Sequence, residues 1–166
     1  MRPVIKGNWP KEADNVTNKS YHPYDKSKED LFGRIGDYCS FCEIWGYSAS
    51  LAVEHVQAKR YKEHGVAIYA HLSEDWNNFL IGCVHCNSVK KNQNVILKDF
   101  HLPHINNTFL TFTYKEGGLV EINNNLNAFQ KKKAKRIMEL VGLGRRPKVK
   151  GYSRKDKRWA ERRTSW

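Results

Sequence analysis

The chain has little of what marks a membrane protein or a secreted protein. Its mean hydropathy is −0.73, and no apolar run approaches the roughly 18 residues that a membrane span needs. Residues 1–10 lack the apolar stretch of a secretory signal. Cysteine is also scarce, with four residues in 166, and without export a disulfide framework is not expected. We therefore expect a cytoplasmic protein whose cysteines bind a metal or take part in redox chemistry.

Acidic residues are few as well. The chain has 17 Asp and Glu against 29 Lys and Arg, a formal charge of +12, which favours a polyanionic partner such as nucleic acid. Residues 145–166 contain ten Lys and Arg, two acidic residues and few aliphatic ones. We therefore expect a domain over 1–144 and a basic, flexible tail over 145–166. Trp159 and Trp166 are large apolar side chains that a purely solvated tail does not need.

Helical and strand patterns are mixed along the chain. Apolar residues make up 40% of it, enough for a modest core, and strands are few. The expected elements are a helix that starts at a capping box over 27–30, a strand within 48–57, a β-hairpin over 109–122 and a helix over 125–141. This order predicts an α+β fold.

Two CxxC pairs give the strongest single pattern, Cys39 with Cys42 and Cys83 with Cys86. Each CxxC turn places two thiolates where both can bind one ion, so two turns supply the four ligands of a structural zinc site. The long segment between the pairs suggests a functional insertion. The alternatives are buried core cysteines or a dithiol redox pair, although a redox motif needs only one CxxC.

A second pattern lies inside and just after this insertion. Glu54 and His55 end the expected strand, an asparagine precedes the second cysteine pair, and an asparagine and a lysine follow it. The pattern resembles the four-cysteine form of the HNH (ββα-metal) nuclease motif, with one departure, an asparagine where many members have histidine. The matching residues are Cys39, Cys42, Glu54, His55, Asn78, Cys83, Cys86, Asn87 and Lys90.

The stretches YCSFCE (38–43), EHVQAK (54–59) and WNNFLIGCVHCNSVKKN (76–92) are similar to PtuB, the HNH subunit of Septu antiphage systems. The resemblance covers roughly residues 1–145. It implies a ββα-metal core over 38–92, stapled by the zinc site, with an added β-hairpin and a C-terminal helix. It also implies a bacterial protein that works beside the ABC/SMC-like ATPase PtuA, in some systems with a retron reverse transcriptase and its RNA–DNA hybrid.

Phosphodiester hydrolysis explains why these residue types would occur together. Histidine is the natural base near neutral pH, which suits His55. The oxygens of Glu54 and Asn87 suit Mg²⁺ or Mn²⁺. Neighbouring side chains on a strand point to opposite faces, so Glu54 and His55 reach one site only if the strand end twists or bulges there. We expect Asn78 to brace the loop beside His55, and Lys90 and Lys91 to contact nucleic acid.

Each of these assignments has a structural alternative. Glu54 would otherwise be solvated or paired with Lys59, Asn87 would cap a helix, and Lys90 would be a solvated helix charge. The leading hypothesis is a metal-dependent HNH endonuclease that acts on DNA or RNA. The competing hypothesis is a zinc-ribbon nucleic-acid-binding or adaptor protein without catalysis. The pairing of Glu54–His55 with Asn87 favours the enzyme, because a binding module needs no base.

Overall fold

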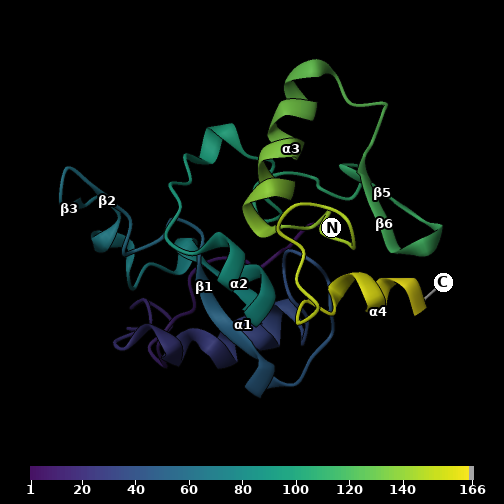
Figure 1. Cartoon of the computed structure of the whole chain (residues 1–166). Helices are drawn as coiled ribbons and strands as arrows, with labels where there is room; N and C mark the ends of the chain where they lie inside the picture. The colour runs from purple at the N-terminus through teal and green to yellow at the C-terminus, as the bar shows by residue number, and fades with distance from the viewer. Residues whose placement is uncertain (165–166) are drawn as a thin grey trace.

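Two antiparallel strands and the helix that follows them form the centre of the molecule. The computed structural model describes residues 1–164, and in it β1 (Leu51–His55) pairs with β4 (Phe79–Cys83). The register places Leu51 opposite Cys83 at one end and His55 opposite Phe79 at the other. Helix α2 (Val84–Lys90) begins directly after β4 (Figure 1). The order is therefore strand, strand, helix, with a long loop between the strands.

The core lies around β4, all five residues of which are buried. Helix α1 (Lys28–Ile35) packs against this strand, and Tyr21 of the N-terminal arm stacks on Trp76 at 5.7 Å between ring centroids. The expected capping box is wrong. Ser27 is the N-cap residue of α1, but its hydroxyl donates to the Tyr24 carbonyl at 2.7 Å and makes no cap.

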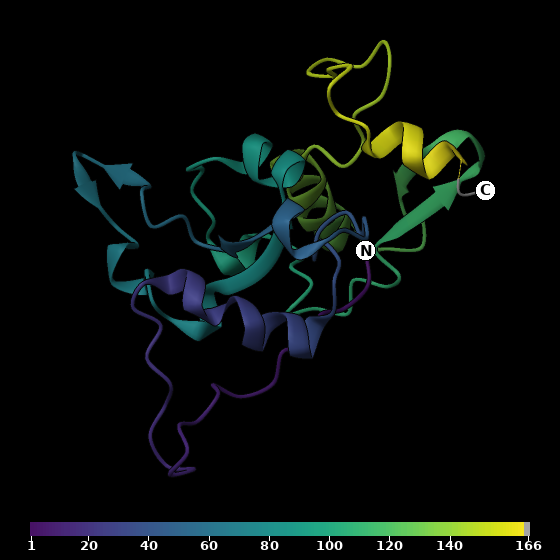
Figure 2. The ribbon, with the colours of Figure 1, turned by 90° about the horizontal axis from the view of Figure 1, so that it is seen from below.

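Two further strand pairs lie outside this centre. Strands β2 (Lys62–Glu63) and β3 (Val66–Ala67) form a short hairpin in the loop between β1 and β4, which projects from the body in both views (Figures 1 and 2). Strands β5 (Phe112–Lys115) and β6 (Leu119–Ile122) form a hairpin within the expected range. The mixture of helices and small sheets that the sequence predicts is confirmed.

Helix α3 (Ala128–Val141) shows how local sequence sets a helix end. Asn127 and Gln130 form a reciprocal capping box at its start, and Gly142 adopts a φ of +63° at its end. A left-handed residue of this kind is the usual stop for a helix, and glycine adopts it without steric cost. The helix that the sequence predicts over 125–141 is thus present, but it begins three residues later, at Ala128.

The structure differs from the expected flexible tail. Residues Arg158–Thr164 form a helix, α4, which lies beside the β5–β6 hairpin (Figure 2). The first residue of α4, Arg158, is only 2% exposed. The low aliphatic content of residues 145–166 predicts that none of them is buried. Arg158 is buried nonetheless, because all of its N–H donors have hydrogen-bond partners. Trp166 lies outside the described residues.

A membrane-spanning helix is not found within residues 1–164, where every helix is too short or too polar for that role.

Candidate metal centre and active site

The four cysteines meet in one buried cluster. Their Sγ atoms all lie within 4.8 Å of one another, and those of Cys42 and Cys83 are 3.6 Å apart. Zn–S bonds of about 2.3 Å in a tetrahedron separate the sulfurs by about 3.8 Å, so the cluster has the size of a zinc site. All four are free thiols. Burial raises the pKa of Cys86 well above its usual value, so a cation is needed to hold it as a thiolate.

Backbone hydrogen bonds tie the two CxxC turns together. Ser40, inside the first turn, donates its N–H to the Ile81 carbonyl at 2.8 Å, and its hydroxyl accepts from the Ile81 N–H at 3.2 Å. In the second turn, Cys83 is the N-cap of α2, and its sulfur accepts from the Cys86 N–H at 3.5 Å. The strand–helix junction therefore presents one cysteine pair, and the first turn is fastened onto the same strand.

His55 lies at the opposite end of the β1–β4 ladder from the cysteine cluster. It is 7% exposed, and the Tyr24 and Phe79 rings contact it edge-on at 4.7 and 5.3 Å between centroids. Its Nε2 is 2.9 Å from the Ser73 carbonyl oxygen. A carbonyl only accepts, so Nε2 carries the proton and Nδ1 of the neutral ring is left as an acceptor. Burial lowers the pKa of His55, which favours this neutral form near pH 7.

Asn78 fastens the two chain segments beside His55. Its Oδ1 accepts from the Gln57 N–H at 2.8 Å, and its Nδ2 donates to the carbonyls of Gln57 at 3.0 Å and Leu72 at 3.2 Å. Gln57 lies two residues after His55, and Leu72 precedes Ser73, the partner of the imidazole. The side chain is 5% exposed and does not reach open solvent. This is the geometry that a bracing residue requires.

Glu54 and Lys90 form a buried ion pair. The Lys90 Nζ lies 2.7 Å from Glu54 Oε1 and donates to the His55 carbonyl at 2.7 Å. The side chain of Lys90 is 1% exposed and that of Glu54 is 8% exposed. Burial raises the pKa of Glu54, while the ammonium of Lys90 opposes that rise. The predicted nucleic-acid contact by Lys90 is corrected here, because an ammonium enclosed in this way cannot touch a phosphate.

A hollow of about 210 Å³ brings the remaining candidates together. Its lining includes Glu54, His55, Asn87 and Lys91, while Asn78, Lys90 and the four cysteines are absent from it. The full lining is Tyr24, Val53, Glu54, His55, Ala58, Lys59, Arg60, Asn87, Lys91 and Asn92. Although Glu54 and His55 are adjacent on β1, both reach this hollow at the strand end. It therefore combines a neutral imidazole, a carboxylate, amides and cations.

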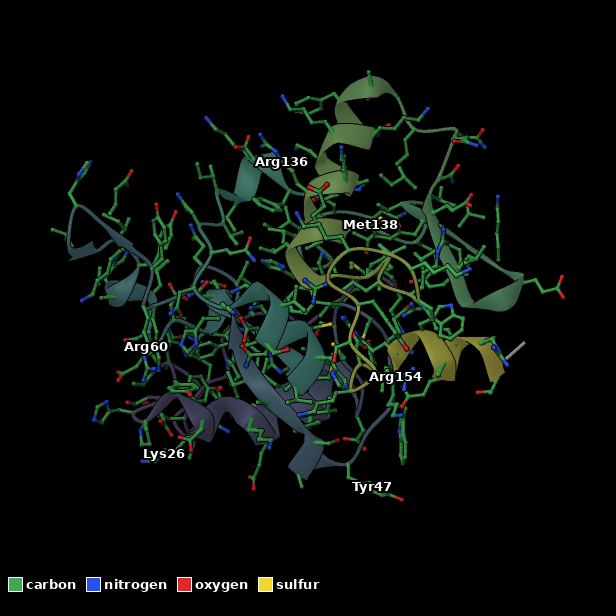
Figure 3. All side chains as sticks on the ribbon, in the orientation of Figure 1. Lys26, Tyr47, Arg60, Arg136, Met138 and Arg154 are labelled. Atoms are coloured by element: carbon green, nitrogen blue, oxygen red, sulfur yellow. The ribbon has the colours of Figure 1, made fainter. Side chains whose placement is uncertain are left out.

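Six lining residues were not among the sequence candidates, and three of them, Tyr24, Lys59 and Arg60, carry an aromatic ring or a positive charge. Lys59 Nζ lies 3.6 Å from the centroid of the Tyr24 ring, and Arg60 follows it. Arg60 lies on the side of the molecule that carries the β2–β3 hairpin (Figure 3). Two adjacent basic residues that follow Glu54–His55 closely in sequence could have indicated Lys59 and Arg60 as site residues. Tyr24 lies too far from His55 in sequence to be linked to it without the fold.

Comparison with known proteins gives the hollow no assignment: neither the protein-family models nor the curated proteins matched this chain.

Proposed function

We propose that this chain is a metal-dependent endonuclease of the HNH type that hydrolyses phosphodiester bonds in nucleic acid. The observation that carries the proposal is His55. Its Nε2 is committed to the Ser73 carbonyl and its Nδ1 remains available, in a hollow that also contains Glu54 and Asn87. A structural histidine has no need of a hollow that is also lined by a carboxylate, amides and several cations.

Side chains of this chain can accept the proton of the attacking water and bind the phosphates of the substrate. His55 Nδ1 takes a proton from the attacking water, and the Ser73 carbonyl holds the ring in the tautomer that can do so. The resulting imidazolium keeps its bond to that carbonyl, which stabilises the charge. Lys59, Arg60 and Lys91 attract the phosphates that flank the scissile bond. Asn78 fixes the loop segments on both sides of the base.

Glu54 and Asn87 are the residues that would hold Mg²⁺ or Mn²⁺. Their donor set fits a hard cation, since both offer oxygen and the pairing with Lys90 favours the ionised form of Glu54. When bound, the ion supplies positive charge to the leaving oxygen and to the phosphate. The zinc centre stands at the other end of the β1–β4 ladder, so its role here is to fix the fold.

The resemblance to PtuB supports a wider role as the effector subunit of an antiphage complex with an ATPase of the PtuA kind. That role stays part of the proposal, as do the partners and the choice between DNA and RNA.

The test is a cleavage assay on a mixed panel of duplex DNA, single-stranded DNA and RNA. Protein stripped with EDTA is given Mg²⁺ or Mn²⁺, and His55→Ala is compared with His71→Ala, an exposed histidine in the same loop. Loss of a general base typically costs 10²–10⁴-fold, so only His55→Ala should lose activity. Equal cleavage by both variants would refute the assignment. Metal-independent binding without cleavage would favour the zinc-ribbon binding protein instead.

A further inference from the structure

The C-terminal segment reaches the cysteine cluster through one side chain. Arg158, the first residue of α4, donates from Nη1 to Cys86 Sγ at 3.1 Å and to the Val141 carbonyl at 2.7 Å. Its Nη2 donates to the Gly142 carbonyl at 3.3 Å. Arg158 therefore bridges a cysteine of the cluster and the carbonyl end of α3, where the helix dipole is negative.

The same guanidinium is paired with Asp156. Nε and Nη2 of Arg158 lie 2.9 and 2.6 Å from the two carboxylate oxygens of Asp156. This fork fixes the plane of the guanidinium, so that Nη1 points at the sulfur and not elsewhere. The arrangement satisfies the donors of a buried cation, which explains how Arg158 can be buried within so basic a segment.

A second arginine of α4 lines a hollow that Cys42 of the first CxxC turn also lines. Arg162 donates to the carbonyls of Gly118 and Leu143, each at 3.2 Å, and lines a hollow of about 490 Å³ together with Cys42. Zinc bound by four thiolates carries an excess of negative charge. Helix α4 thus donates one guanidinium directly to Cys86, and a second lines the same hollow as Cys42, so both add positive charge near the cluster.

The backbone of α4 also docks tightly on the β5–β6 turn. A Cβ atom at Gly118 would lie 2.8 Å from the Trp159 carbonyl oxygen and 2.9 Å from the Arg163 nitrogen. Only glycine leaves room for this approach. The docking of α4 can therefore be disturbed at Gly118 without altering any cysteine or arginine.

We propose that α4 is the outer shell of the zinc centre: Arg158 is a positioning residue for Cys86, and zinc retention and the docking of residues 158–164 stabilise each other. A metal-bound cysteine is a thiolate, which accepts the Arg158 N–H more strongly than a thiol does. Such linkage is reciprocal, so loosening α4 must weaken zinc binding as much as losing zinc loosens α4. The proposal needs zinc in the cluster but does not depend on nuclease activity.

The first experiment measures zinc in the full chain. After metal analysis of the purified protein, zinc release to a colorimetric chelator is followed for Arg158→Gln and for Arg154→Gln, which removes the same charge at an exposed position beside α4 (Figure 3). Outer-shell partners typically contribute 10–100-fold to metal affinity. We expect release to be about 10-fold faster in Arg158→Gln only. A protein without zinc, or equal release from both variants, would overturn the proposal.

The second experiment reads the sulfur itself. In cobalt-substituted protein, the sulfur-to-cobalt charge-transfer band should shift in Arg158→Gln, because Cys86 loses a hydrogen bond, and should stay in place in Arg154→Gln. Arg158→Lys keeps the charge without the fork and should give a smaller shift. A band that is identical in all three variants contradicts a positioning role for Arg158.

Hydrogen exchange separates docking from general unfolding. In Gly118→Ala we expect residues 158–164 to lose protection while β1 and β4 keep theirs, and zinc release to accelerate although Arg158 and every cysteine are present. If α4 exchanges freely in this variant and zinc is retained as in the wild type, the reciprocal coupling is wrong.

Discussion

The buried pair of Lys90 and Glu54 allows a prediction about Lys90→Met, which removes the ammonium and keeps most of the apolar stem. If Lys90 were a surface residue that contacts phosphate, its loss would weaken nucleic-acid binding and leave stability almost unchanged. Because its side chain is 1% exposed and lies 2.7 Å from the carboxylate, the substitution instead leaves a buried carboxylate without its partner. We therefore expect a large loss of stability.

The magnitude follows from the burial. An exposed ion pair contributes about 0.2–1 kcal/mol, whereas removing one partner of a buried pair costs about 3–5 kcal/mol. Domains of this kind are stable by about 5–15 kcal/mol in total. With a urea dependence of about 2 kcal/mol per molar, the unfolding midpoint of Lys90→Met should fall by about 2 M.

The pH dependence provides a second measure of the same effect. Burial already raises the pKa of Glu54, and removing Lys90 should raise it further. A carboxyl whose pKa is raised by folding adds stability at low pH and loses it as the pH rises through the folded-state value. The deficit of Lys90→Met relative to wild type should therefore become smaller as the pH falls toward the usual carboxyl pKa.

Urea unfolding of zinc-loaded protein, followed by circular dichroism, is the assay. The control is Lys91→Met, which removes the same charge from the exposed neighbour and should change stability by less than about 0.5 kcal/mol. The double variant Glu54→Gln/Lys90→Met removes both charges and should regain part of the loss. Wild-type stability in Lys90→Met, with weakened nucleic-acid binding, would refute our interpretation of this pair.

Two further predictions concern the hollow around His55. Burial lowers the pKa of His55 below its usual 6.5, so the neutral base persists to lower pH. We therefore expect kcat/KM to rise with pH to a plateau, with the midpoint of the rise below pH 6.5. A midpoint above that value contradicts a buried neutral base. Asn87→Ala should raise the Mg²⁺ or Mn²⁺ concentration needed for half-maximal cleavage while nucleic-acid affinity measured in EDTA stays near wild type. If that variant weakens affinity without changing the metal requirement, Asn87 serves only to position α2.

Short-range sequence patterns determined the features that depend on neighbouring residues. Spacing within each CxxC pair sets two thiols on one turn, and the joint occurrence of two such pairs predicted the cluster that the structure brings together. Asn125–Val141 predicted α3, since its stripe of apolar residues and Gly142 act over a few residues. Such features can be predicted from the sequence because the interactions that cause them join residues within one or two turns of the chain.

Only the tertiary structure decided which charges are buried. Nothing near Lys90 distinguishes it from the exposed Lys91, yet β1 places a carboxylate and a carbonyl against one ammonium and leaves the other in solvent. The same holds for Arg158, which meets Cys86 from 72 residues away. A charged side chain is buried only where distant segments supply its partners. The composition counts every charge equally and does not show which of them are buried. The sequence alone therefore indicates which cysteines can bind a metal together, while the fold determines which cations are buried and which remain exposed.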